Sequence, residues 1–238
     1  MNKTLFIQKR YNKLNYCEYI PKINRGEKVP LVLFLHGGGE RGSDNKSQLK
    51  NAILKVINKK STSKFMNSVV IAPQCPLNIR WVNTLSGDGN YTLAKVEESK
   101  LMKQVVSLVK SYMNLDFIDK NRVYVIGLSI GGFGTWDLLA RHSDIFTAGV
   151  PICGGGPTDA INILKNIPIY TFHGTNDFVV PYSGTKEMVD LIIGAGGTKI
   201  NFVSFKSAGH NVWDDAIIYD GDRANPNLED WLFNNRNR

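Results

Sequence analysis

The sequence predicts an α/β protein, with a mainly parallel, twisted sheet, helices on both of its faces and an N-terminal antiparallel hairpin. Short apolar runs alternate along the chain with segments of helical periodicity, as in repeated strand–helix units. Most of these runs are continuously apolar, which is typical of strands buried on both faces. The length of 238 residues fits one domain, residues 1–238, with a core large enough to need no disulfide or metal.

The strands are expected in the following places. Residues 4–10 and 13–20 are rich in Tyr, Phe and Ile and are joined at Tyr11-Asn12, which favours an antiparallel hairpin at the sheet edge. The buried strands are predicted at residues 30–35, 68–72, 122–127, 148–152, 167–172 and 199–205.

The clearest helical pattern runs from about residue 94 to residue 113, where Leu101, Val105, Leu108 and Tyr112 share one face. Shorter helices are predicted at residues 132–141, 184–193 and 228–234, and the glycine-rich residues 194–197 are expected to end the second of these three. Residues 44–65 are lysine-rich and irregular, and no element is predicted there.

Composition excludes several classes of protein. Hydrophobic residues make up 42% and charged residues 21%, close to the average for globular proteins. The net charge is +8, but the lysines are scattered and no nucleic-acid motif is present, so we expect no nucleic-acid partner. No apolar run approaches the roughly 20 residues that span a bilayer, so we expect no membrane partner.

The N-terminal residues and the cysteines bear on the compartment. The first ten residues carry charge but no apolar h-region, so we expect a cytoplasmic protein, with secretion open if a leader has been removed. Cys17, Cys75 and Cys153 are odd in number and widely spaced. We therefore expect reduced, unpaired thiols and no metal site.

The strongest sign of chemistry is Gly127-Leu128-Ser129-Ile130-Gly131, a G-x-S-x-G sequence between a predicted strand and a predicted helix. In this context the pattern predicts a nucleophile elbow, a sharp turn that presents a serine hydroxyl. Glycines flank the turn because side chains would collide across it. Ser129 is therefore the predicted nucleophile, and the alternative is a glycine-rich turn with an incidental serine.

A second glycine-rich segment, residues 36–42, follows the first parallel strand. Acyl transfer passes through an oxyanion that rigid N–H donors stabilise. Where a nucleophile elbow occurs, one donor is the amide after the nucleophile and the other comes from this loop. We expect an oxyanion hole formed by the amides of Ile130 and Gly38, with Gly37 and Gly39 as alternatives to Gly38.

The predicted acid is Asp177, in a loop that directly follows a buried strand. A carboxylate there can orient an imidazole and stabilise its charged form. A simple turn aspartate is the alternative interpretation. Asp214 and Asp215 are competing acids, but they lie close in sequence to the candidate base and on the helix that follows it.

The predicted base is His210, which follows the last predicted strand. Of the other histidines, His36 and His173 are expected to pack beneath their loops, and His142 lies at the end of a helix. The resulting chain order of serine, aspartate and histidine is that of the elbow fold.

With these residues, the chain resembles the esterase branch of the α/β hydrolases. It is most similar to the phospholipase/carboxylesterase-like ("predicted peptidase") group, which is related to feruloyl esterases and polyhydroxybutyrate depolymerases. The resemblance extends over residues 30–213 and rests mainly on residues 35–42 and 127–136, with support from residues 72–76 and 151–156. It implies ester hydrolysis without a cofactor.

The expected substrate follows from a short connection. Residues 153–166 leave no room for a cap domain, so we expect an open site for short-chain or aryl esters, either small molecules or polysaccharide-linked feruloyl and acetyl esters. Trp81, Trp213 and Phe178 are candidates to bind the substrate, with core packing as the alternative. A serine peptidase on the same triad and a non-catalytic binding protein remain open, as does the oligomeric state.

Overall fold

The strands of the computed structural model, which describes residues 5–59, 63–84 and 89–237, lie close to the predicted positions. Most predicted boundaries are correct to within a few residues, and the third parallel strand starts earlier than expected. The strands are β1 (Ile7–Tyr11), β2 (Leu14–Tyr19), β3 (Val29–Leu35), β4 (Val69–Pro73), β5 (Ile118–Leu128), β6 (Ala148–Ile152), β7 (Ile169–Gly174) and β8 (Ile200–Phe205).

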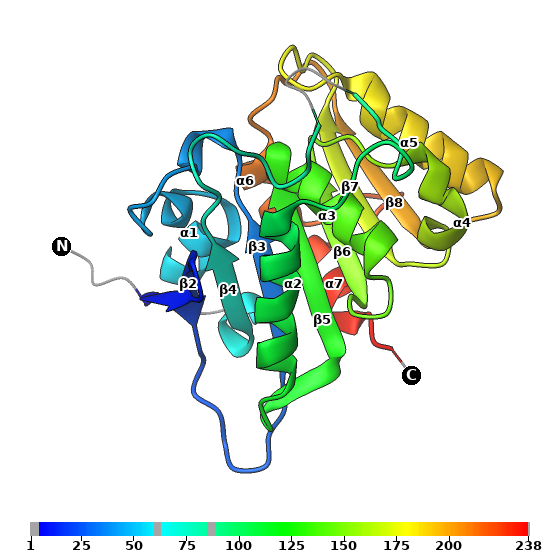
Figure 1. Ribbon diagram of the computed structural model, residues 1–238. Helices are drawn as coiled ribbons and strands as arrows, with labels where there is room; N and C mark the ends of the chain where they lie inside the picture. The colour runs from blue at the N-terminus through cyan, green and yellow to red at the C-terminus, as the bar shows by residue number, and fades with distance from the viewer. Residues whose placement is uncertain (1–4, 60–62, 85–88, 238) are drawn as a thin grey trace.

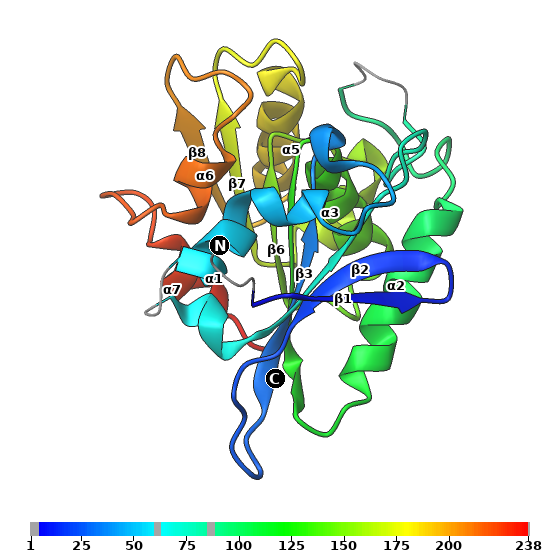
Figure 2. The same ribbon diagram turned by 90° about the vertical axis from the view of Figure 1, so that its left-hand side faces the viewer.

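Within the described residues these strands form one sheet in the order β1-β2-β4-β3-β5-β6-β7-β8 (Figures 1 and 2). The pairs β1–β2 and β2–β4 are antiparallel, and all other pairs are parallel. The predicted fold class is therefore confirmed. The carboxyl ends of the parallel strands meet at one edge of the sheet, where ligands usually bind in open α/β sheets.

The N-terminal hairpin is confirmed, with its turn one residue later than predicted. Tyr11 pairs with Leu14, so Asn12 and Lys13 form the turn. Asn12 has a φ of 53°, in the left-handed region that asparagine tolerates better than most residues.

The helices cover the sheet on both sides (Figures 1 and 2). One face carries α2, α3, α4 and α5, and the other carries α1, α6 and α7. Their bounds are α1 (Ala52–Lys59), α2 (Lys100–Met113), α3 (Ile130–Arg141), α4 (Ile161–Leu164), α5 (Tyr182–Gly194), α6 (Trp213–Ile217) and α7 (Leu228–Asn234). Short 3-10 turns are η1 (Gly38–Glu40), η2 (Ser47–Lys50), η3 (Lys64–Asn67) and η4 (Thr158–Ala160).

Two helical expectations were wrong. The long helix begins at Lys100 rather than near residue 94, because the Ser99 hydroxyl caps it by accepting a hydrogen bond from the Met102 amide at 3.0 Å. The segment 44–65 is not irregular, since it contains η2, α1 and the start of η3. Its first residue, Asp44, accepts hydrogen bonds from the amides of Lys46 and Ser47 and thereby fixes the entry to η2.

Alternation along the strands divides the core into two layers. In β3, Leu31, Leu33 and Leu35 belong to the layer under α2 and α3, whereas Val32 and Phe34 belong to the layer under α1, α6 and α7. Every residue of β3 is buried, which explains why its sequence is continuously apolar.

All three cysteines are buried and unpaired, in agreement with the expectation of unpaired thiols. No helix in the described part of the chain is both long and apolar enough to cross a membrane.

Candidate active site

The turn between β5 and α3 holds Ser129 in a conformation that few residues adopt, with φ 55° and ψ −120°. The positions on either side of this turn must be glycine because a side chain there would collide with the backbone. A Cβ on Gly127 would lie 2.1 Å from the Gly131 carbonyl oxygen, and one on Gly131 would lie 2.1 Å from the Leu35 carbonyl oxygen. The local strain therefore directs the serine side chain to the carboxyl edge of the sheet.

The three residues that the sequence singled out lie together at this edge. His210 Nε2 is 2.9 Å from Ser129 Oγ, and His210 Nδ1 is 2.6 Å from Asp177 Oδ2. An ionised carboxylate only accepts hydrogen bonds, so Nδ1 carries the proton and Nε2 is the acceptor that faces the serine hydroxyl. This arrangement can withdraw the serine proton as Oγ attacks an electrophile.

Asp177 is buried and nevertheless stays ionised. Burial alone raises the pKa of this carboxyl, but hydrogen bonds from His173 and His210 and from the Val180 and Val179 amides outweigh it and hold the pKa well below its usual value. Both amides donate to Oδ1, at 2.8 and 2.9 Å. Oδ2 is thereby left for the two imidazoles.

His173 has a role that the sequence analysis missed. It is fully buried in β7, and its Nε2 lies 3.0 Å from Asp177 Oδ2 while its Nδ1 lies 2.7 Å from the Thr185 hydroxyl of α5. The carboxylate is thus shared by two histidines, one facing the serine and one facing the core. The only sequence signal for this contact is that His173 and Asp177 are four residues apart. Because a loop lies between them, this spacing does not fix the distance between their side chains.

Cys153 lies beneath the acid and, with His173 and Asp177, forms a group whose potential metal ligands are within 4.8 Å of one another. Each of these side chains already has another partner: the thiol is 3.4 Å from the His210 carbonyl oxygen, and the other two form the hydrogen bonds described above. Burial also raises the pKa of the Cys153 thiol to about 12, which disfavours the thiolate that a metal would need. The group therefore supports the acid loop rather than fitting a cation.

The glycine-rich loop after β3 passes directly over the elbow. A Cβ on Gly37 would lie 2.6 Å from Leu128 Cδ1 and 3.6 Å from Ser129 Cβ. The Glu40 carboxylate packs against Gly37, with its Oε2 3.2 Å from the place that a Cβ on this glycine would take. Gly38 remains the expected donor beside Ile130, with Gly37 and Gly39 as alternatives. The Ile130 amide is the first in α3 and so has no acceptor within the helix.

Glu40 is a second residue that the sequence analysis missed. Its carboxylate lies beside Gly37 and accepts a hydrogen bond from Asn51 Nδ2 at 2.6 Å. It therefore ties the glycine-rich loop to the segment that enters α1. Burial raises the pKa of Glu40, and hydrogen bonding to the carboxylate opposes that effect.

His36 and Trp81 support the loop from beneath. His36 Nδ1 lies 2.6 Å from the Gly37 carbonyl oxygen, and its Nε2 accepts from the Cys75 amide at 2.9 Å. Burial lowers the pKa of His36 to about 4, so the ring is neutral. It packs beneath the loop, as predicted. Trp81 is 0% exposed and its indole donates to the His36 carbonyl oxygen at 3.0 Å. The prediction that Trp81 binds substrate was wrong, because its ring lies in the core.

The other two substrate-binding candidates lie beside the triad. The half-buried Trp213 makes a T-shaped contact with the His210 ring, with centroids 5.4 Å apart. Phe178 follows the acid directly and is 96% exposed. Between β6 and β7 the chain forms only η4 and α4, and no cap domain lies over the site in the described residues.

Two named proteins are similar in sequence to parts of this chain. "Probable feruloyl esterase C" of Aspergillus niger is 26% identical over 153 residues, which are 64% of this chain and 52% of that protein. A bifunctional acetylxylan esterase/xylanase of Neocallimastix patriciarum is 28% identical over 97 residues, 41% of this chain and 14% of that protein. The chain thus spans about half of one relative and about a seventh of the other.

Among solved structures, a thermostable esterase is similar over 98% of this chain and 63% of its own, with a TM-score of 0.77 and 28% identity. A serine on a strained strand-to-helix turn, followed in sequence by an aspartate and a histidine, defines the α/β-hydrolase class on such a sheet. Within that class the chain belongs to the phospholipase/carboxylesterase family, whose model matches residues 20–218.

Proposed function

We propose that this protein is a serine carboxylic-ester hydrolase that acts through an acyl-enzyme intermediate. The observation that carries the proposal is the pair of hydrogen bonds made by His210, at 2.9 Å to Ser129 Oγ and 2.6 Å to Asp177 Oδ2. The family and the esterases among its relatives agree with this chemistry.

In the first half of the reaction, His210 Nε2 takes the Ser129 proton while Oγ attacks the ester carbonyl carbon. The carbonyl oxygen becomes an oxyanion, which the amides of Ile130 and Gly38 stabilise. When the tetrahedral intermediate collapses, the bond from carbon to the alkoxy oxygen breaks and His210 returns the proton to the leaving alcohol. The acyl group remains on Ser129.

In the second half, water replaces the alcohol. His210 removes a proton from water as its oxygen attacks the acyl carbon, and the oxyanion forms again between the same amides. Collapse breaks the bond to Oγ, and the serine recovers its proton from His210. Throughout, the ionised Asp177 stabilises the positive imidazolium that forms in each half.

The substrate class follows from the open edge of the sheet. No cap covers the site in the described residues, so a bulky alcohol, including a polysaccharide, can approach Ser129. Trp213 and the exposed Phe178 offer aromatic surface to an acyl or aryl group. The feruloyl and acetylxylan esterase relatives favour aryl and acetyl esters, small or polysaccharide-linked, as the substrates.

The test is hydrolysis of p-nitrophenyl acetate by the wild type and by Ser129→Ala, with labelling by a fluorophosphonate probe. We expect turnover and labelling that both disappear in the variant, because the triad acts as a unit. A folded wild type that neither turns over nor labels would indicate a binding protein. Faster cleavage of a matched anilide than of the ester would indicate a peptidase.

A further inference from the structure

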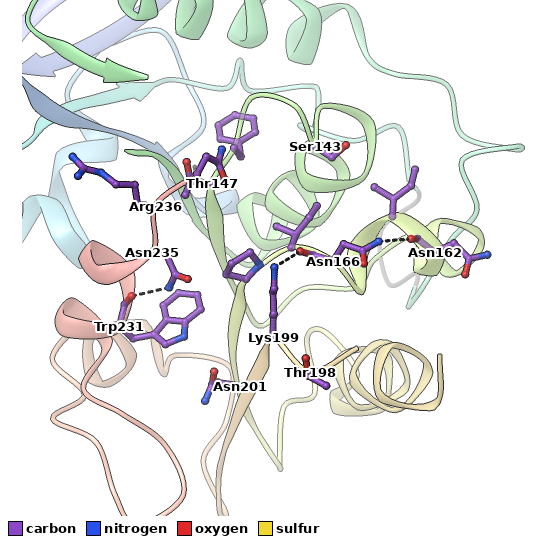
Figure 3. A pocket seen from close by; sticks show the side chains of 15 residues that line it. Ser143, Thr147, Asn162, Asn166, Thr198, Lys199, Asn201, Trp231, Asn235 and Arg236 are labelled. Atoms are coloured by element: carbon purple, nitrogen blue, oxygen red, sulfur yellow. Dashed lines mark hydrogen bonds between the residues drawn. The ribbon is translucent and has the colours of Figure 1, made fainter. Parts of the chain in front are cut away.

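A cavity of about 740 Å³ lies at the end of the sheet opposite the triad. Thr147, Pro168 and Lys199 line it, and these residues directly precede β6, β7 and β8 (Figure 3). The strands between the two ends have five or six residues, so the cavity is roughly 17–20 Å from the carboxyl edge at 3.3 Å per residue. It is therefore separate from the proposed catalytic site.

The lining of this cavity is rich in amides. Among its described lining residues none is acidic, and five are asparagines: Asn162, Asn166, Asn201, Asn235 and Asn237. In the part of the chain that the structure describes, the side-chain amides of Asn162, Asn201 and Asn237 have no hydrogen-bond partner. Each amide offers a donor and an acceptor at once.

An aromatic side chain completes the lining. Trp231 of α7 is half-buried and makes a T-shaped contact with Tyr170, with ring centroids 5.1 Å apart and planes at 71°. Its ring is thus held in place, and within the described residues its indole N–H has no partner. Figure 3 shows Trp231 facing Lys199 and Asn201 across the hollow.

The two cations of the lining are already engaged. Arg236 donates to Asp119 Oδ2 at 2.6 Å, and Lys199 donates to the Asn166 carbonyl oxygen at 3.2 Å. A phosphate or another compact anion would have to compete with these contacts. The free hydrogen-bonding capacity of the cavity is therefore mainly that of neutral amides.

We propose that this cavity binds a neutral oligosaccharide. Sugar hydroxyls both donate and accept, which matches the asparagine amides, and the C–H face of a pyranose ring can pack on an indole. The size of the cavity suits a ligand of two or three sugar rings, since sites for small ligands span about 300–1,000 Å³. Because the cavity is far from Ser129, a chain bound there tethers the protein to a polymer rather than placing an ester for attack.

The experiment measures binding without turnover. Ser129→Ala protein is titrated with xylohexaose and with cellohexaose by calorimetry, and tryptophan fluorescence is followed in parallel. We expect at least one hexasaccharide to bind and to change the tryptophan emission. In the same background, Asn201→Ala and Trp231→Phe should each weaken binding about three- to tenfold, the effect of one lost hydrogen bond. Phenylalanine keeps an aromatic ring against Tyr170, so the second variant should fold.

The matched control is Asn67→Ala, which removes an exposed asparagine amide at the end of η3, away from the cavity. It should leave affinity unchanged. The proposal is overturned if neither sugar binds at millimolar concentration, or if both cavity variants bind like the control. It is equally overturned if Trp213→Ala, beside His210, abolishes binding, since that places the sugar at the triad. None of these outcomes bears on ester hydrolysis, which is measured separately with the wild type.

Discussion

At the scale of single residues, Asp177 is the most heavily constrained group of the candidate site. Two amides fix one oxygen and two imidazoles share the other. Only one of these four donors belongs to the base, so three contacts hold the carboxylate independently of His210. Under the proposed function, the buried His173 is a positioning residue that holds the acid through Oδ2.

Asp177→Asn should lower kcat on p-nitrophenyl acetate by about four orders of magnitude, as expected when a triad acid becomes an amide. An asparagine amide can donate to His210 Nδ1 and so favour the wrong tautomer, and it carries no charge to stabilise the imidazolium. Asp215→Asn is the control, because Asp215 is exposed on α6 and was a competing acid in the sequence. Equal losses in both variants, or a loss below tenfold in the first, would contradict the assignment.

The same carboxyl should make stability depend on pH. Its pKa is lower in the folded protein than in the unfolded chain, whose value is about 3.9, so its ionisation favours folding. This contribution is fully present above the unfolded pKa and is lost as the pH falls through the folded pKa. Between pH 7 and pH 3, the free energy of unfolding should therefore fall more steeply for the wild type than for Asp177→Asn, as measured by urea titration. Parallel curves would show that Asp177 does not titrate in this way.

At the scale of elements, the turn from β5 to α3 is set by steric exclusion. Gly127→Ala would place a Cβ 2.1 Å from the backbone oxygen of Gly131, which flexible side chains cannot relieve. We expect a loss of more than about 4 kcal/mol in unfolding free energy, or insoluble protein. Gly194→Ala, at the end of α5 where a Cβ meets nothing within 4 Å, should change stability by less than about 1 kcal/mol. Similar behaviour of the two variants in urea denaturation would contradict the steric account.

The elements that the sequence predicted are those with local signals. The buried strand β3 is continuously apolar, and the elbow has its glycines at fixed spacing. The start predicted for α2 is too early because the apolar spacing continues N-terminal to Ser99, the residue that caps the helix. In α1 the buried residues Ile53, Leu54 and Ile57 do have helical spacing, but the surrounding lysines concealed it.

In the candidate site, too, the sequence predicts the features that have a local signal. Chain order and position after strands identified Ser129, Asp177 and His210, which the structure brings together. Contacts that depend on how a loop turns back were not predictable, and the pair of His173 with Asp177 is an example. The prediction for Trp81 is wrong because a tryptophan in a loop has the same sequence signature whether it lines a cleft or, as here, lies in the core.

At the scale of the whole molecule, the two ends of the sheet differ in character. The carboxyl edge presents the triad with Trp213 and Phe178, while the opposite edge holds the amide-lined cavity. Neither end is enclosed by a cap in the described residues. Under the proposed function, we therefore expect a substrate whose acyl group is small and whose alcohol is large.

The open carboxyl edge should limit the benefit of longer acyl chains. Full burial of the four methylenes that separate butyrate from octanoate would be worth about 3 kcal/mol, or roughly 200-fold in kcat/KM. Without a cap those methylenes remain mostly in water, so the kcat/KM values for p-nitrophenyl acetate, butyrate and octanoate should agree within about tenfold, with no rise at octanoate. The measurement uses concentrations below micelle formation, with Ser129→Ala as the blank. A rise of about a hundredfold from butyrate to octanoate would mean that the protein buries the chain in an apolar channel, and the proposed substrate class would then shift to lipids.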